Sequence, residues 1–382
     1  MTRILHVLTS PRAEGTPRLV LDWLGTAGHE QGVAFLTGEP PDLLDEFRRA
    51  ANWIRLGRAL PRGPRKFPAI VRAARGWVGE FRPDVVIAWP TGFSHWIFLG
   101  ARAAGGGARL LAHGGNPPGT GWVDRQVMTC LCLWTTALCD GQLVACSRYV
   151  QERFQAVPLV PRHRVAFAYN SLRAGTVADR AAAARARRKP GGRFRAIMVA
   201  TLETHKDHAT LLRALAAALA GGADLELALV GAGRLADALR TQADALGLGA
   251  RVEFLGARRD VPELLGQSDL FVFSTTAQEG WGVAVLEALA AGLPVVASDV
   301  PALREALADG RWGRLVSAGD PGALARALAD AARTGPETAP VRAARQAYAG
   351  SFTPQRMIDA YLAIAGDSPS AAVASSPAVL AL

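Results

Sequence analysis

Cysteine, lysine and long apolar runs are all scarce in this sequence of 382 residues. The cysteines are Cys130, Cys132, Cys139 and Cys146, with neither Cys-x-x-Cys spacing nor a nearby histidine set, which argues against a zinc site and a disulfide framework. We expect buried thiols in a reducing compartment. The longest apolar stretches, around 127–139, fall short of the roughly 20 residues that a bilayer span needs. The N-terminus enters a strand-like run without a leader region, so we expect a cytoplasmic protein.

Acidic pairs of the Asp-x-Asp type are also absent, and we expect no metal cofactor. The lysines are Lys66, Lys189 and Lys206, while arginine brings the net charge to +10. Residues 1–173 hold 21 cations and 12 acids, whereas residues 196–382 hold 15 cations and 20 acids. The first half is therefore suited to an anionic surface or substrate. An arginine-rich but merely solvated surface remains the alternative.

Short apolar runs alternate with helix-length segments through the first half. The expected strands are 4–8, 33–36, 85–88, 109–112, 142–145 and 165–168, and the expected helices include 18–27, 67–78 and 123–138. This alternation predicts an α/β fold with a doubly wound parallel sheet. We place this first domain at 1–173.

The alternation restarts after a stretch rich in Ala, Arg and Gly, which predicts a basic linker at 174–195. The expected strands of the second domain, 196–350, are 196–199, 225–230, 252–255, 270–273 and 295–298. A helix at 351–365 should return towards the first domain, and 366–382 should be a disordered tail. Two such sheets in one chain predict a ligand cleft between the domains.

The most informative segment runs from Gln278 to Ser298, where two glycines precede a helix that ends before the strand at Val295. Backbone N–H groups at such a helix start favour an anion, particularly a phosphate. Glu279 lies at the helix start and Glu287 two turns later, so the two carboxylates can bind separate parts of one polyhydroxy ligand. The alternative is that Glu279 caps the helix and Glu287 is solvated.

This segment resembles the signature of the retaining glycosyltransferases of family 4, which have the GT-B fold of two Rossmann-like domains. The resemblance implies that Glu279 contacts the hydroxyls of the donor sugar and Glu287 the ribose of the nucleotide. It also implies that the amides of the intervening residues, Gly280, Trp281, Gly282 and Val283, approach the diphosphate.

The segment Val199 to Leu212 is similar to the same family. Lys206 matches the family lysine that neutralises the leaving diphosphate, but Thr201 stands where an arginine is usual. A different phosphate geometry, a substituting arginine such as Arg258, or reduced turnover would each fit this departure. Lys206 lies at a helix start, where the helix dipole disfavours a cation, which favours a functional role over an incidental one.

Two turns of the second domain are further candidates for the binding surface. Gly231 and Gly233 form a Gly-x-Gly-x-x-Ala turn that, in isolation, is typical of dinucleotide binding. The resemblance instead assigns it to the nucleotide of the donor, and it assigns the turn at Gly256, Ala257 and Arg258 to the surface facing the base.

The resemblance is weaker in the first domain, which it makes the acceptor-side domain. Gly15 is the remaining glycine of a loop that the family places near the donor phosphates and the acceptor. His113 follows a strand and resembles the family histidine that lines the reacting sugar. An ordinary capping or core histidine is the alternative.

Between Arg55 and Arg75 the chain has seven cations and no acid, flanked by Trp53 and Trp77. This pattern suits the headgroup region of an anionic membrane. No nucleic-acid motif accompanies it, so we expect no nucleic-acid partner. We expect peripheral docking at the inner face of the cytoplasmic membrane, unless the segment is only a solvated face.

The resemblance implies a retaining glycosyltransferase that moves a sugar from a nucleoside diphosphate sugar, of the UDP or GDP type, to a glycan or lipid-linked acceptor. Its expected setting is the assembly of surface polysaccharide, lipopolysaccharide or glycolipid. His113, Lys206 and Glu279 are the expected catalytic residues. A GT-B epimerase or phosphorylase, a nicotinamide oxidoreductase, and a nucleotide-sugar-binding protein with weakened turnover are the alternatives.

Overall fold

The computed structural model describes residues 1–13, 15–26, 28–58, 60–119, 121–188, 191–334 and 337–366, without the side chains of 122, 123 and 125. The chain divides into two compact units. Unit 1 contains Met1–Ser171 together with the C-terminal helix from Pro354, and unit 2 contains Leu172–Thr353.

Unit 1 is built on a parallel sheet of seven strands in the order β3-β2-β1-β4-β5-β6-β7. Its strands are β1 (Thr2–Leu8), β2 (His29–Phe35), β3 (Trp53–Leu56), β4 (Val85–Ala88), β5 (Arg109–Gly114), β6 (Gln142–Ala145) and β7 (Val165–Phe167). The central strand β4 is buried along its whole length. A parallel sheet covered on both faces explains why such strands appear in the sequence as unbroken apolar runs.

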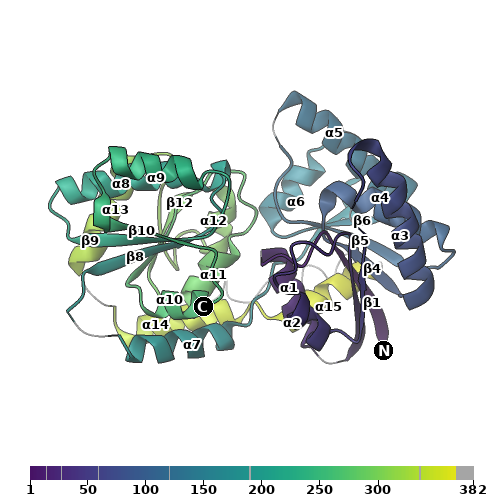
Figure 1. The fold of residues 1–382 in the computed structure, drawn as a ribbon, viewed down its shortest axis with the longest axis horizontal. Coiled ribbons are helices and arrows are strands. Elements are labelled where there is room, and N and C mark those ends of the chain that lie inside the picture. The colour runs from purple at the N-terminus through teal and green to yellow at the C-terminus, as the bar shows by residue number, and fades with distance from the viewer. Residues whose placement is uncertain are drawn as a thin grey trace. The chain divides into compact units, whose positions relative to one another are not determined.

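Helices cover both faces of this sheet, with α3 and α4 packed together on one of them (Figure 1). The helices of unit 1 are α1 (Gly15–Leu24), α2 (Leu44–Ala50), α3 (Lys66–Phe81), α4 (Ser94–Ala103), α5 (Trp122–Leu133), α6 (Arg148–Gln155) and α15 (Pro354–Ala365). The C-terminal helix α15 packs against α1 and β5. Its side chains Ile358, Tyr361 and Ile364 belong to the core of unit 1.

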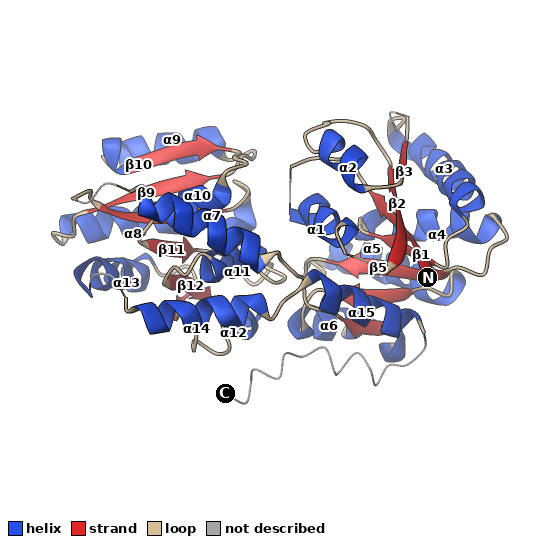
Figure 2. Ribbon diagram, turned by 90° about the horizontal axis from the view of Figure 1, so that it is seen from below, coloured by secondary structure: helices blue, strands red, loops and turns tan. Residues whose placement is uncertain are grey.

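Unit 2 is built on a parallel sheet of six strands in the order β10-β9-β8-β11-β12-β13. Its strands are β8 (Phe194–Val199), β9 (Leu225–Val230), β10 (Val252–Gly256), β11 (Leu270–Phe273), β12 (Val295–Asp299) and β13 (Arg314–Ser317). In each unit the first three strands run from the middle of the sheet to one edge, and the later strands run from the other side of the first strand to the opposite edge. Both parallel sheets are therefore doubly wound (Figure 2).

The helices of unit 2 are α7 (Ala174–Ala186), α8 (His208–Ala220), α9 (Ala236–Ala245), α10 (Val261–Gly266), α11 (Val283–Ala290), α12 (Pro301–Ala306), α13 (Pro321–Thr334) and α14 (Ala339–Gly350). Helices α8, α9 and α13 lie on one side of the sheet, and α7, α10 and α14 on the other (Figure 1).

The linker expected over 174–195 is wrong for most of its length. Helix α7 occupies Ala174–Ala186 and packs against α10, α11 and α14, so this segment is part of unit 2. Arg180 forms a two-bond ion pair with Glu263, with nitrogen to oxygen distances of 2.8 and 2.7 Å. The alanine-rich face of α7 is buried. The linker was predicted from composition alone, which does not show that alanine favours a helix here. The tail expected at 366–382 lies outside the described residues beyond Gly366.

Two edge strands were absent from the sequence-based prediction, β3 in unit 1 and β13 in unit 2. Each is short, partly exposed and contains an arginine, Arg55 or Arg314. An edge strand pairs on one side only and therefore needs no continuous apolar run. The other expected strands are present with ends shifted by a few residues.

Candidate functional site

Backbone hydrogen bonds join the loops at the carboxyl ends of three strands of unit 2. The amide of Leu202, after β8, donates to Ala232 at 3.0 Å, and the amide of Gly231, after β9, donates to Gly256 at 2.8 Å. The structure therefore brings together the Thr201, Gly231 and Gly256 turns that the sequence predicted as binding surface. Carboxyl ends of parallel strands are the usual ligand-binding edge of such a sheet.

Gly231 and Gly233 are required by this close approach. A Cβ atom at Gly231 would lie 1.9 Å from the carbonyl oxygen of Ala200, and one at Gly233 would lie 2.4 Å from that of Leu202. Gly231 also has φ +146°, a conformation that side chains rarely adopt. These glycines have a structural role in joining two loops, whatever else they bind.

The Glu279 carboxylate is buried at the start of α11, with only 5% of the residue exposed. Its Oε1 atom accepts hydrogen bonds from the amides of Gly280, Trp281 and Gly282, at 3.2, 3.4 and 3.1 Å. Gly282 has φ +78°, and this left-handed turn directs the three amides to one point. The helix start thus binds an anion that belongs to the chain itself.

In this structure the amides from Gly280 to Gly282, which the sequence predicts to approach the diphosphate of the donor, bind the carboxylate of Glu279. The nearest carboxylate, that of Glu279, already lies where amides and helix dipole favour negative charge. A ligand anion reaches these N–H groups only if the Glu279 side chain turns away.

Lys206 completes the site by an ion pair between its Nζ and Oε2 of Glu279. It ends a short helical turn, Thr204–Lys206, before α8, and its Nζ lies 5.0 Å from the ring centre of Phe273. Its side chain is only 14% exposed. Lys206 is therefore not an incidental surface lysine, because a desolvated ammonium needs such a partner.

Burial alone would raise the pKa of Glu279, but the charge of Lys206 and the hydrogen bonds from Lys206 and Trp281 outweigh it and lower the pKa. Nearby, burial and the charge of Lys206 lower the pKa of His208 to about 4. Glu279 is thus ionised and His208 neutral at pH 7.

Outside the turn whose amides bind Glu279, the predicted residues of unit 2 are more exposed than Glu279. Glu287 is half-buried on α11, while Thr201, Ala257 and Arg258 are exposed and Val283 begins α11. The guanidinium of Arg258 donates to both oxygens of Asp260, at 2.8 and 2.6 Å. Because Arg258 is already paired with Asp260, it is a poor replacement for the arginine that the family usually has at position 201.

Arg234, which sequence analysis passed over, lies beside the segment that carries Lys206. Its guanidinium pairs with Glu203 at 2.7 Å and donates to Thr204 at 3.2 Å. Its place after the Gly231 turn is the sequence signal that could have marked it.

His113 was expected to follow a strand, but it is the penultimate residue of β5 in unit 1 and is buried, with 3% exposed. Its Nδ1 lies 2.8 Å from the hydroxyl of Tyr361 on α15. The ring centre of Trp89 lies 4.8 Å from that of His113. Burial lowers the pKa of His113 to about 4, so the ring is neutral at pH 7. Sequence analysis missed Tyr361, because the C-terminal helix looked like an ordinary amphipathic helix.

Gly15, which was expected in a loop, is the exposed first residue of helix α1. A Cβ atom at Gly15 would meet no atom within 4 Å. Packing within the described structure therefore does not require this glycine.

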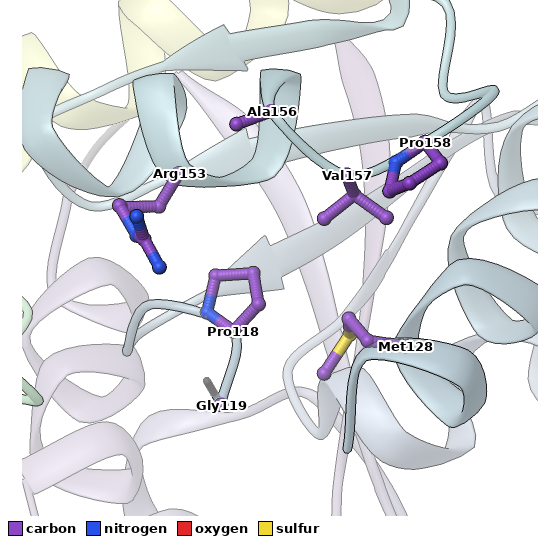
Figure 3. A pocket seen from close by; sticks show the side chains of 7 residues that line it. All are labelled: Pro118, Gly119, Met128, Arg153, Ala156, Val157 and Pro158. Carbon is purple, nitrogen blue, oxygen red and sulfur yellow. The ribbon is translucent and has the colours of Figure 1, made fainter. Parts of the chain in front are cut away.

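A cavity of about 290 Å³ opens elsewhere in unit 1, between the loop after β5, α5 and the end of α6 (Figure 3). Its lining is Pro118, Gly119, Met128, Arg153, Ala156, Val157 and Pro158. None of the predicted site residues lines this cavity.

The basic segment of unit 1 differs from the membrane-facing pattern expected for it. Arg58, Arg62 and Arg72 are exposed, but Trp77 is buried and the Trp53 ring packs against Phe81 at 5.0 Å. The two flanking tryptophans are therefore structural, and the surface that remains is a cationic one. Among the described helices, none is both long and apolar enough to cross a membrane.

The comparison with family models matches residues 179–348 to the glycosyl transferases group 1 family. Phosphatidyl-myo-inositol mannosyltransferase of Mycobacterium leprae is 40% identical over 128 residues, which cover 33% of this chain and 33% of that protein. This chain therefore matches about a third of that relative's length. The GDP-mannose-dependent alpha-(1-6)-phosphatidylinositol monomannoside mannosyltransferase of Mycolicibacterium smegmatis is 27% identical over 278 residues, covering 69% of this chain and 71% of that protein.

Solved structures match both units. Anabaena HepE in complex with UDP and glucose has a TM-score of 0.77 and 19% identity, and the match covers 98% of this chain and 100% of that one. WaaG, a glycosyltransferase involved in lipopolysaccharide biosynthesis, has a TM-score of 0.63 and 17% identity, with 91% and 94% covered.

The fold is therefore GT-B, with two Rossmann-like domains. Residues 179–348, within unit 2, match the glycosyl transferases group 1 family, in agreement with the resemblance to the family 4 glycosyltransferases in this part of the sequence.

Proposed function

We propose that this protein is a retaining glycosyltransferase that moves a sugar from a nucleoside diphosphate sugar to an acceptor hydroxyl in the assembly of a glycolipid or polysaccharide. The observation that carries the proposal is the buried pair of Lys206 and Glu279 at the start of α11, within a group 1 domain. Such a pair keeps a cation and a carboxylate desolvated at the edge where ligands bind.

In this function the protein acts by positioning and by charge, without a protein nucleophile. Lys206 neutralises the leaving diphosphate, Glu279 orients the sugar through its hydroxyls, and Glu287 binds the ribose. The amides from Gly280 to Val283 bind the diphosphate once the Glu279 carboxylate has turned to the sugar. The leaving diphosphate takes the proton of the acceptor hydroxyl on the same face of the donor.

The donor is of the UDP or GDP type. UDP is supported by the HepE complexes, which contain UDP, and GDP by a relative whose name specifies GDP-mannose. The glycolipid setting is supported by the relatives named as phosphatidylinositol mannosyltransferases.

A thermal-shift screen of the purified protein against UDP, GDP and ADP, with their sugar conjugates and with NAD as a control, tests the donor site. A ligand at about 100 times its dissociation constant adds about 2.7 kcal/mol to the stability. We expect a shift with one nucleotide that is lost in Glu287→Ala. A shift with NAD alone, or with no nucleotide at saturation, would refute the donor site.

The anomeric configuration of the transferred sugar tests the retaining mechanism separately. One-dimensional proton NMR of the product formed from an α-linked donor should show an α-linkage. A β-linked product would exclude retention while leaving glycosyl transfer intact.

The cationic face of unit 1, defined by Arg58, Arg62, Arg65, Arg72 and Arg75, is proposed to contact an anionic membrane at the inner face of the cytoplasmic membrane. Each cation near such a surface adds roughly 1 kcal/mol, without any insertion of tryptophan. Flotation with vesicles containing phosphatidylglycerol, compared with neutral vesicles, checks this contact. Equal flotation with both would rule it out.

A second candidate function, a nucleotide-sugar-binding protein with weak turnover, is favoured by one observation, the exposed Thr201 in place of an arginine. In that case Thr201→Arg should raise the transfer rate with little change in nucleotide affinity. An unchanged or lower rate would argue against it.

A further inference from the structure

His113 and Tyr361 meet in the core of unit 1 although they are 248 positions apart in the sequence. The Tyr361 ring is fully buried, and it packs edge-on against Trp23 at 5.0 Å and stacks on Trp89 at 6.1 Å. Its hydroxyl therefore has a fixed position opposite Nδ1 of His113.

The direction of the hydrogen bond between Tyr361 and His113 follows from the other hydrogen-bond partners available to each group. If Nδ1 of His113 carried the proton, the hydroxyl of Tyr361 would need another acceptor, and within the described residues its hydrogen-bond partner is His113 alone. A buried hydroxyl without an acceptor costs free energy. The hydroxyl therefore donates to Nδ1, which leaves the proton of the neutral imidazole on Nε2.

The neighbouring His6 follows the same pattern. The indole of Trp89 can only donate, and it donates to Nδ1 of His6 at 3.2 Å. Nε2 of His6 then donates to Oε1 of Gln31 at 3.1 Å, and the amide of Gln31 donates to Trp23 at 3.1 Å. In His6 the Nε2–H group has an acceptor within the protein, whereas in His113 no described residue accepts from it.

Gly115 keeps this Nε2–H group accessible. A Cβ atom at position 115 would lie 3.3 Å from Nε2 of His113 and 3.7 Å from its Cδ2. The backbone at Gly115 does not have a positive φ, so backbone strain does not require glycine there. The carbonyl of Gly115 accepts from the thiol of Cys146 at 3.3 Å, which fixes this strand end.

We propose that Tyr361 is a positioning residue that holds His113 as the Nε2–H tautomer, so that the imidazole donates a hydrogen bond over Gly115 to a hydroxyl oxygen of a bound ligand. The inference rests on the proposed function only in taking that ligand to be a sugar. It gives the C-terminal helix a role in the site of unit 1.

Nitrogen-15 NMR of the histidine-labelled full chain tests the tautomer without any ligand, with the His113 signals assigned from their loss in His113→Gln. We expect an unprotonated Nδ1 and a protonated Nε2. Tyr361→Phe should give a mixture of tautomers, whereas Tyr348→Phe, which removes a buried hydroxyl that donates to Ala306 in unit 2, should leave the signals unchanged. A protonated Nδ1 in the wild type, or an unchanged Nε2–H tautomer in Tyr361→Phe, would overturn the proposal.

The variant Gly115→Ala tests access to the Nε2–H group of His113 separately from the tautomer of His113. It should keep the wild-type spectrum and yet lower kcat/KM for the sugar donor roughly tenfold, about the loss of one hydrogen bond of 1.4 kcal/mol. Tyr361→Phe should lower kcat/KM by a similar factor and also change the spectrum. Wild-type kcat/KM in Gly115→Ala would refute the donor role of Nε2. If the tautomer is as stated but no nucleotide sugar binds the wild type, the proposed function fails and the Tyr361 assignment stands.

Discussion

The candidate residues of unit 2 are charged, whereas those of unit 1 are neutral. In unit 2 a buried ammonium and a buried carboxylate, Lys206 and Glu279, compensate each other. In unit 1 a neutral imidazole, His113, is held by a neutral hydroxyl, that of Tyr361. An ion pair depends strongly on both partners being present, whereas a neutral pair depends on which atom carries the proton. The difference predicts that the pair of Lys206 and Glu279 is sensitive to loss of charge and the pair of His113 and Tyr361 to pH.

The largest expected effect is that of Glu279→Gln, which leaves Lys206 as an uncompensated buried cation. Removal of one partner of a buried ion pair costs about 3–5 kcal/mol. Hydrogen exchange followed by mass spectrometry should show the loss in peptides of β11 and α11. Peptides of β4 in unit 1 serve as the internal reference.

The double variant Glu279→Gln with Lys206→Met isolates the pair from other effects. It should recover part of the lost stability, because no buried charge remains unpaired. Equal or greater loss in the double variant would mean that the ion pair is not what stabilises this loop.

The sequence predicted more of unit 2 than of unit 1, and the contrast above explains why. Lys206 and Glu279 each lie in a local pattern, next to a strand end and a helix start, so both residues could be singled out from their neighbours in the chain. Tyr361 has no such signal, since its meaning depends on helix α15 packing beside β5. The sequence also could not show that the Glu279 side chain turns towards the amides of the three residues that follow it, because this depends on the left-handed turn at Gly282.

The second effect concerns pH and separates the pair of His113 and Tyr361 from the pair of Lys206 and Glu279. Burial lowers the pKa of His113 from 6.5 to about 4, so the unfolded chain binds the proton more readily in that range. Its contribution to stability is complete above pH 6.5 and is lost as the pH falls towards 4. Between pH 7 and pH 5 this amounts to about 2 kcal/mol. Glu279, with a lowered pKa, contributes above its unfolded value near 4.5 and loses that contribution only at lower pH.

Urea denaturation followed by tryptophan fluorescence at pH 7 and pH 5 measures this effect, since most tryptophans lie in unit 1. His113→Gln should be less stable at pH 7 but less dependent on pH than the wild type. Glu279→Gln should keep the wild-type dependence over this range. An identical pH dependence in wild type and His113→Gln would contradict the neutral state assigned to His113.

A smaller effect is expected at the glycine turn of unit 2. Gly233→Ala brings a Cβ atom to 2.4 Å from the carbonyl oxygen of Leu202, so the two loops must separate. We expect a loss of upwards of about 1 kcal/mol in the free energy of unfolding. We also expect weaker nucleotide binding, measured by isothermal titration calorimetry. Wild-type stability would show that the loops adjust without cost.

The smallest effect has the opposite sign and lies in unit 1. Gly76 is exposed within α3, no atom lies within 4 Å of a Cβ atom built there, and its φ is not positive. Gly76→Ala should therefore raise the stability by about 0.5–1 kcal/mol, because alanine restricts the unfolded chain and favours the helix. Thermal denaturation of this variant beside Gly233→Ala compares a glycine that is free to change with one that loop contact requires. A loss of stability in Gly76→Ala would mean that this face of α3 is covered in solution, which would also bear on the cationic face that α3 carries.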